Sequence, residues 1–98
     1  MARIPEEEIE RIRILLEGFL ASLERRGYRP ATVAAWRGSL CRFFEFVQSA
    51  GVFSVRVPME LFFSFGRELS AQGLPEAAVC RHETRVIKFY IWLVNKER

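Results

Sequence analysis

Four features that define large classes of protein are missing from this sequence. Its 98 residues include two cysteines, Cys41 and Cys80, and a single histidine, too few for a disulfide framework or for the paired ligands of a zinc site. No apolar run approaches the roughly 18 residues that span a bilayer, and the opening MARIPEEEIE lacks the basic and then apolar layout of a signal peptide. We therefore expect reduced thiols in or beside the core, no metal or cofactor, no membrane segment and a cytoplasmic location.

The composition is that of one compact domain. Half of the residues are hydrophobic and 13% are aromatic, against 28% charged, which excludes a disordered tail. A chain of this length can bury a core without metals or disulfides, so we expect a single domain over residues 1–98. The net charge of +3 is concentrated in residues 29–58, which carry four bases and one acid. This mild excess favours an anionic partner.

Prolines and glycines divide the sequence into four segments. Proline is favoured at the first helical position, and glycine readily takes the left-handed conformation that ends a helix. Four prolines therefore predict helix starts, at Pro5, Pro30, Pro58 and Pro75. Three glycines predict helix ends, at Gly27, Gly51 and Gly73.

Apolar residues recur at helical spacing in every segment. In the first two segments they are Ile9, Ile12, Leu16, Phe19, Leu20 and Leu23, then Val33, Trp36, Leu40, Phe43, Phe44 and Val47. In the last two they are Met59, Phe62, Phe63, Gly66 and Leu69, then Val79, Val86, Phe89, Tyr90 and Leu93. The strand-like stretch VFSVRV, residues 52–57, cannot form a sheet alone, and we interpret it as a loop. The pattern predicts an all-α bundle of four helices.

The second and fourth predicted helices have similar sequences. Aligning Gly27 with Gly73 superposes five apolar positions, namely Val33 with Val79, Leu40 with Val86, Phe43 with Phe89, Phe44 with Tyr90 and Val47 with Leu93. Two copies are too few for a solenoid, which needs about three or more repeats. The similarity can also mean only that both helices meet the core in the same way.

Cations gather on the same two helices. In the fourth, Arg81, Arg85 and Lys88 recur at i, i+4 and i+7, on the side opposite the apolar stripe. In the second, Arg37 and Arg42 stand among small residues with one opposing charge. A single stripe of this kind is usually a solvated helix face. Two cationic helices together favour binding in the major groove of DNA, where arginine and lysine contact phosphates or guanine.

An ordered set of residues runs through most of the chain. In its first half the set consists of Phe19, Leu20, Leu23, Gly27, Pro30, Thr32, Val33, Leu40, Phe43 and Phe46. Trp36 belongs to the same set, at a position where sequences with this pattern commonly have tyrosine. In its second half the set consists of Gly73, Leu74, Val79, Arg81, Phe89, Tyr90, Trp92 and Leu93. In this order and spacing, residues 19–98 resemble the N-terminal core-binding domain of the tyrosine recombinases, the phage-integrase and Xer-like family.

The resemblance implies a SAM-like, orthogonal four-helix bundle that forms half of a clamp around double-stranded DNA, with its second and fourth helices facing adjacent grooves. It also implies that the isolated domain is monomeric and meets other recombinase protomers in a full-length protein. We expect seven residues to contact the duplex, namely Thr32, Arg37, Arg42, Arg81, Thr84, Arg85 and Lys88. The chain departs from the family pattern at Pro75, Glu76, Ala78, Glu83 and Ile87.

The residues His82 and Arg85 form a His-x-x-Arg motif, which the same family uses in catalysis. In the family, that motif belongs to a separate C-terminal catalytic domain with a distant tyrosine nucleophile, for which residues 1–98 leave no room. The family position that matches Tyr90 is a core aromatic. We therefore expect no catalytic residue and no enzymatic activity in this chain, and a His82 that is partly buried or faces DNA.

Two other functions stay open. A helical protein-interaction module without DNA binding would explain the apolar residues off the main stripes, namely Ile14, Leu15, Leu61 and Phe65. A helix-turn-helix regulator is the third alternative, although long helices and the link after Gly51 fit it poorly.

Overall fold

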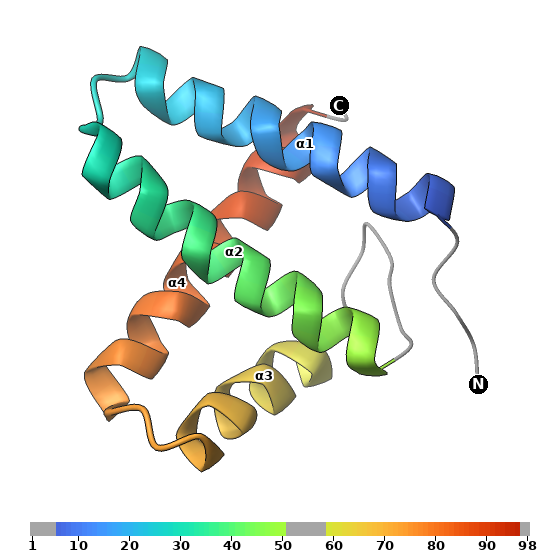
Figure 1. Ribbon diagram of the computed structural model, residues 1–98, viewed down its shortest axis with the longest axis vertical. Helices are drawn as coiled ribbons and strands as arrows, with labels where there is room; N and C mark the ends of the chain where they lie inside the picture. Colours follow the sequence, from blue (N-terminus) through green and yellow to red (C-terminus); the bar gives the residue numbers. More distant parts are fainter. Residues whose placement is uncertain (1–5, 51–58, 97–98) are drawn as a thin grey trace.

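A computed structural model describes residues 6–50 and 59–96 of the chain. These residues form four α-helices, α1 (Glu6–Arg25), α2 (Pro30–Ala50), α3 (Met59–Ala71) and α4 (Glu76–Lys96) (Figure 1). No strand occurs within the two described ranges, so the predicted all-α four-helix bundle is confirmed. The predictions made for Pro5, Gly51, Pro58 and residues 52–57 lie outside the described residues.

The bundle consists of two helical hairpins that cross each other. α1 packs on α2 and α3 packs on α4, and the two pairs meet chiefly where α2 passes in front of α4 (Figure 1). Of the helices in residues 6–50 and 59–96, none combines the length and the hydropathy that crossing a bilayer requires. The crossing of α2 and α4 brings the two cationic helices against each other.

Both hairpins turn in the same way, at the glycines that the sequence predicts. Gly27 and Gly73 each have φ of 90°, a conformation that costs glycine little because it has no side chain. After the first glycine, the Tyr28 N–H donates to the Leu23 carbonyl at 3.1 Å; after the second, the Leu74 N–H donates to the Leu69 carbonyl at 3.2 Å. These bonds satisfy carbonyls that the ends of α1 and α3 would otherwise leave unpaired.

The prolines mark the starts of α2 and α4 to within one residue. Pro30 is the first residue of α2, and the carbonyl of the residue before it accepts a hydrogen bond from the Val33 N–H at 3.0 Å. Pro75 lies one residue before α4, and its own carbonyl accepts from the Val79 N–H at 3.0 Å. The predicted start at Pro75 is therefore early by one residue, because this proline occupies the capping position.

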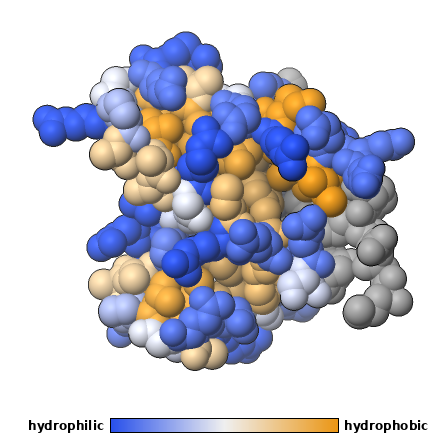
Figure 2. Space-filling view, in the orientation of Figure 1, coloured by the Kyte–Doolittle hydropathy of each residue, from blue (hydrophilic) through white to orange (hydrophobic). Residues whose placement is uncertain are grey.

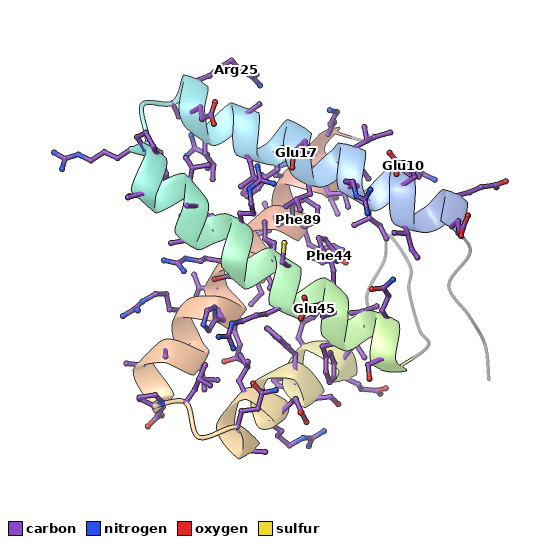
Figure 3. All side chains as sticks on the ribbon, in the orientation of Figure 1. Glu10, Glu17, Arg25, Phe44, Glu45 and Phe89 are labelled. Carbon is purple, nitrogen blue, oxygen red and sulfur yellow. The ribbon has the colours of Figure 1, made fainter. Side chains whose placement is uncertain are left out.

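Aromatic rings from all four helices form the centre of the core. Phe19 of α1 lies 5.4 Å from Phe89 of α4, measured between ring centroids. Phe43 of α2 stacks on Phe62 of α3 at 5.6 Å and meets Tyr90 of α4 at 6.0 Å. Phe89 occupies the space enclosed by α1, α2 and α4 (Figure 3). The apolar stripes predicted for α1, α2 and α4 are thus the surfaces by which the hairpins meet.

The stripe predicted for α3 is partly wrong. Phe65, expected off the stripe, is buried against Phe43 and Phe46 of α2, with ring centroids 5.1 and 5.7 Å apart. Phe63, expected within the stripe, has 59% of its surface exposed. The reason is that α3 packs against both α2 and α4, so its buried arc is rotated from the one that a single stripe defines.

The remaining predicted surface residues behave in two ways. Ile14 is exposed as expected, whereas Leu15 and Leu61 are half-buried and pack against the core. Cys41 and Cys80 are free thiols, as predicted, but both are exposed and neither belongs to the core. Figure 2 shows hydrophilic and hydrophobic residues interspersed on the face in view.

Candidate nucleic-acid interface

Arg85 joins α4 to α2 at the helix crossing. Its Nη1 donates to the backbone carbonyl of Ala35 at 3.3 Å and to the hydroxyl oxygen of Ser39 at 3.0 Å. The guanidinium carbon lies 5.8 Å from the centroid of the Trp36 ring, within the range of a cation–π contact. Burial, and then the charge of Arg81, lowers the pKa of Arg85, but a guanidinium stays charged in proteins. Arg85 is therefore a fixed positive charge.

Other cations collect around this anchor. Arg42 of α2 and Arg81 of α4 act electrostatically on His82, as Arg85 does. The ammonium nitrogen of Lys88 lies 6.0 Å from the centroid of the Trp36 ring, the same ring that Arg85 covers. The structure thus brings together four of the seven predicted residues, and we call Arg42, Arg81, Arg85 and Lys88 the cationic surface. No ion pair involves any of the four within the described ranges.

Arg37 lies apart from the cationic surface. It faces α1, where its Nη2 donates to Oε2 of Glu17 at 3.0 Å and its Nη1 donates to Oε1 of the same carboxylate. The hydrogen bond from Arg37 lowers the pKa of Glu17, and the same bond raises the pKa of Arg37. The sequence offered no local sign of this pair, because the two residues are far apart along the chain. The charge of Arg37 is largely compensated.

The two predicted threonines are exposed. Thr32 lies in the first turn of α2, and Thr84 lies between Arg81 and Arg85 on α4. Neither is drawn into the hydrogen bonds that join α2 to α4. Both hydroxyls can be reached from solvent, which a contact with phosphate requires.

Sequence reasoning missed Ser39, which is fully buried between the two helices. Its hydroxyl oxygen lies 2.7 Å from Nδ1 of His82 and accepts the hydrogen bond of Arg85. His82 and Arg85, the His-x-x-Arg pair, therefore share one serine. The only sequence signal was that Ser39 is a small residue in a cationic helix.

Tyr90 is in the core, as the family position predicts. Its ring contacts Phe43, Phe62 and Phe89, and its hydroxyl has no hydrogen-bond partner among the described residues. Burial raises the pKa of Tyr90 well above the usual value near 10. The tyrosine is packed among rings, whereas His82 and Arg85 bond to Ser39 at the interface with α2.

Glu83 folds over α3 at the rim of the core. A Cβ atom on Gly66 would come within 2.5 Å of Oε2 of Glu83, so the glycine provides the space that the carboxylate occupies. Glu83 is half-buried, and no ion pair joins it to an arginine of α4 in residues 76–96. This acid, which replaces a customary apolar residue of the recombinase pattern, therefore leaves the cations of α4 unpaired.

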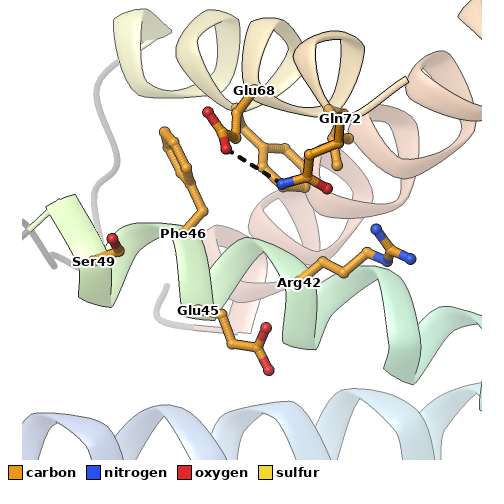
Figure 4. A pocket seen from close by; sticks show the side chains of 8 residues that line it. Arg42, Glu45, Phe46, Ser49, Glu68 and Gln72 are labelled. Atoms are coloured by element: carbon orange, nitrogen blue, oxygen red, sulfur yellow. Dashed lines mark hydrogen bonds between the residues drawn. The ribbon is translucent and has the colours of Figure 1, made fainter. Parts of the chain in front are cut away.

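A groove runs between α2 and α3, with a volume of about 580 Å³. Arg42 lies at one end, Glu68 accepts a hydrogen bond from Gln72 at 3.3 Å on the opposite wall, and Glu45 turns its carboxylate away from α3 (Figure 4). A groove lined by one cation and two acids is a poor place for an anion. An anionic ligand is better accommodated beside it, on the cationic surface.

No three acidic, histidine or cysteine side chains come together in the described part of the chain as a metal site would require. Comparisons with protein-family models, curated proteins and solved structures found no match to this chain. The resemblance to the tyrosine recombinases stays a prediction that depends on the residues quoted for it.

Proposed function

We propose that this domain binds double-stranded DNA through the cationic surface formed by α2 and α4. The observation that carries the proposal is the convergence of Arg42, Arg81 and Arg85 on one place, without an ion pair to any of them in the described residues. Unpaired cations from two crossed helices suit a ligand whose charges are spaced along a backbone. Arg85 needs little further ordering on binding because Ser39 and Ala35 already hold it.

The exposure of each side chain indicates which contact with DNA it can make. Arg81 and Lys88 are exposed and can adjust to phosphates, while Arg85 supplies a fixed charge between them. Thr84, on the same helix, offers a hydroxyl to a phosphate oxygen. With few cations involved, binding is expected to be weak and to depend on salt, with a slope of log K against log salt of about −0.9 for each phosphate neutralised.

The sequence pattern extends this proposal to a biological role. We propose that the domain serves as the core-binding domain of a tyrosine recombinase, holding one side of a recombination site. In that role the reaction chemistry belongs to a separate catalytic domain. The support for this step is the resemblance of residues 19–98, together with the position of Tyr90 as a core aromatic.

A triple substitution tests the DNA-binding proposal. Arg81→Ala, Arg85→Ala and Lys88→Ala together are expected to weaken binding to a labelled duplex of about 20 base pairs by on the order of a thousandfold, since each charged hydrogen bond contributes at least about 1.5 kcal/mol. Fluorescence anisotropy at low salt gives the affinity, and circular dichroism confirms the fold.

The matched control removes three exposed arginines from α1 and α3, as Arg13→Ala, Arg25→Ala and Arg67→Ala. It changes the net charge equally and is expected to weaken binding only a few-fold. Equal losses in the two triple variants would show attraction to net charge alone. That result, or unchanged binding by the α4 variant, would contradict the proposed surface.

A protein-interaction module remains the second candidate because of one observation on α4. Ile87, Ile91 and Val94 are 45%, 56% and 52% exposed and recur at i, i+4 and i+7, so they form one apolar stripe on the surface. Leu15, Leu61 and Phe65, which the sequence suggested for such a module, instead pack in or against the core. The candidate therefore depends on the exposed stripe of α4. Light scattering tests this candidate: self-association that Ile91→Lys abolishes, without binding to duplex DNA, would favour it.

A further inference from the structure

Ser39 can exchange hydrogen-bond partners without losing any bond. Its oxygen accepts from Nη1 of Arg85 at 3.0 Å, and it lies 2.7 Å from Nδ1 of His82 and 3.3 Å from the carbonyl oxygen of Ala35. An arginine only donates, so the hydroxyl proton of Ser39 is left for His82 or Ala35. The shorter distance favours donation to Nδ1, which places the proton of a neutral His82 ring on Nε2.

The same geometry also accommodates a protonated ring. Nδ1–H would then donate to Ser39, whose oxygen has two lone pairs and can accept from Arg85 and His82 together. The hydroxyl proton would turn to the Ala35 carbonyl, which lies within reach at 3.3 Å. Both charge states of His82 are therefore satisfied at Nδ1, and in both states Nε2–H remains a donor for a ligand.

The surroundings of His82 disfavour a proton on its ring in the free protein. Burial is the largest cause that lowers its pKa below 6.5, followed by the charges of Arg42 on α2 and of Arg85 and Arg81 on α4. On the α3 side, Glu68 lies across the groove that Arg42 lines and is hydrogen-bonded to Gln72. The three guanidinium groups that repel a proton on His82 would also hold an anion beside it.

We propose that His82 is itself a phosphate-binding residue, which takes up a proton when a phosphate group binds between it and the arginines of the cationic surface. The proposal rests on the proposed function in one respect, since it identifies the phosphate as one of a DNA backbone. A bound phosphate offsets the repulsion from Arg42, Arg81 and Arg85 and adds an attraction for the imidazolium. Ser39 supplies the bond at Nδ1 that orients the ring in either state.

The test uses the fact that His82 is the single histidine of the chain. Its ring protons give isolated NMR signals, and their shift with pH reports the titration midpoint directly. We expect the midpoint to rise by about one pH unit or more when a saturating duplex of about 20 base pairs is added. The linkage between the two then requires DNA affinity to rise by roughly three- to fivefold from pH 8 to pH 6, and to approach about tenfold only below both midpoints.

A second arm with inorganic phosphate identifies the source of the anion. If the titration midpoint of His82 rises with the duplex alone, the anion is a backbone phosphate. If the midpoint rises with inorganic phosphate and the duplex does not bind, the phosphate site is supported and the proposed DNA function is overturned. If the duplex binds and the midpoint does not move, the assignment of His82 is wrong and the proposed function stands. No rise with either ligand also overturns the assignment.

Two variants separate the role of the ring from that of its neighbours. His82→Gln keeps a polar side chain. Its affinity for DNA is expected to rise at low pH only by the amount that the change in the net charge of the protein explains. Ser39→Ala retains the histidine but removes the bond at Nδ1, and we expect a smaller rise of the midpoint with DNA. A pH dependence in His82→Gln equal to that of the wild type would overturn the proposal, because no other histidine exists in the chain.

Discussion

α2 and α4 occupy equivalent places in the two hairpins, yet their surfaces differ. Both follow a glycine turn and both are 21 residues long. All the apolar positions that align when Gly27 is superposed on Gly73 are buried, except that Phe44 is half-buried. The cations of α4 carry no ion pair in the described residues, whereas Arg37 of α2 is bound to Glu17. The fold therefore repeats, and so does one unpaired cation, since Arg42 aligns with Lys88 and neither has an ion pair in the described residues. Arg81 and Arg85 of α4 have no cationic counterpart on α2, where the aligned residues are Ala35 and Ser39.

The aligned polar positions show where the difference arises. Arg37 aligns with Glu83, Trp36 with His82, and Ser39 with Arg85. In the first hairpin the position of Arg37 is used to pair with α1, and in the second the position of Glu83 is used to cover Gly66 of α3. α4 also carries unpaired cations, and one of them, Arg85, anchors α4 to α2 through Ser39. Equivalent backbone positions thus serve packing in both hairpins, and more of the unpaired cations lie on α4 than on α2.

The largest expected effect tests whether the two hairpins contribute equally to the core. Phe43→Ala and Phe89→Ala change aligned, fully buried residues, and each is expected to lower the free energy of unfolding by about 3–5 kcal/mol. Urea denaturation measures both losses. If one substitution is nearly silent, the core equivalence of the hairpins is wrong.

The next effect compares single arginines on the two helices. Arg81→Ala is expected to weaken duplex binding by on the order of tenfold and to reduce the salt slope by about 0.9. Arg37→Ala, which also changes an exposed arginine, is expected to cost less than about twofold, because Glu17 already neutralises that charge. Anisotropy over a series of salt concentrations gives both quantities; a greater loss for Arg37→Ala would reverse the comparison.

A smaller effect concerns the glycine beneath Glu83. Gly66→Ala is expected to raise the free energy of unfolding by about 0.5–1 kcal/mol, since alanine favours a helix interior. The three atoms nearest to the new Cβ belong to the carboxyl end of the flexible Glu83 side chain, which can turn away from α3. Thermal or urea denaturation measures the change. A loss of stability would mean that specific interactions, and not only the space above Gly66, hold the Glu83 carboxylate over α3.

The smallest effect is the dependence of stability on pH. Burial and three arginines lower the pKa of His82 in the folded protein, so the unfolded chain takes up a proton first as the pH falls through about 6.5. Between pH 7.5 and pH 5.5 the wild type should therefore lose more stability than His82→Gln, as measured by urea denaturation. An equal loss in both proteins would show that the folded state does not disfavour a charged His82.

Much of the fold could be predicted because local rules and burial agreed. Gly27, Gly73 and Pro30 mark helix boundaries through their own backbone conformations, which need no tertiary contact to be recognised. The exchange of Phe63 and Phe65 could not be predicted, because the buried side of α3 is set by two neighbours at once. Periodicity locates a stripe, but it does not say how a short helix is rotated between two others.

The candidate site was predicted in part for the same reason. The stripe of Arg81, Arg85 and Lys88 is a property of one helix, and helical spacing is sufficient to find it. The pair of Arg37 with Glu17 and the bond of Ser39 to His82 join residues that are distant in sequence. Only the packing of α1, α2 and α4 brings them together, so no local pattern could have identified them.

The most direct test of the central claim is to map the contact surface by NMR. A 15N-labelled sample is titrated with a short duplex, and the amide shift changes are followed residue by residue. We predict the largest changes at residues 81–88 and around Ser39 and Arg42, with little change along α1. Changes centred on α1 or on Ile91 and Val94, or spread evenly over the molecule, would contradict a DNA-binding surface at the crossing of α2 and α4.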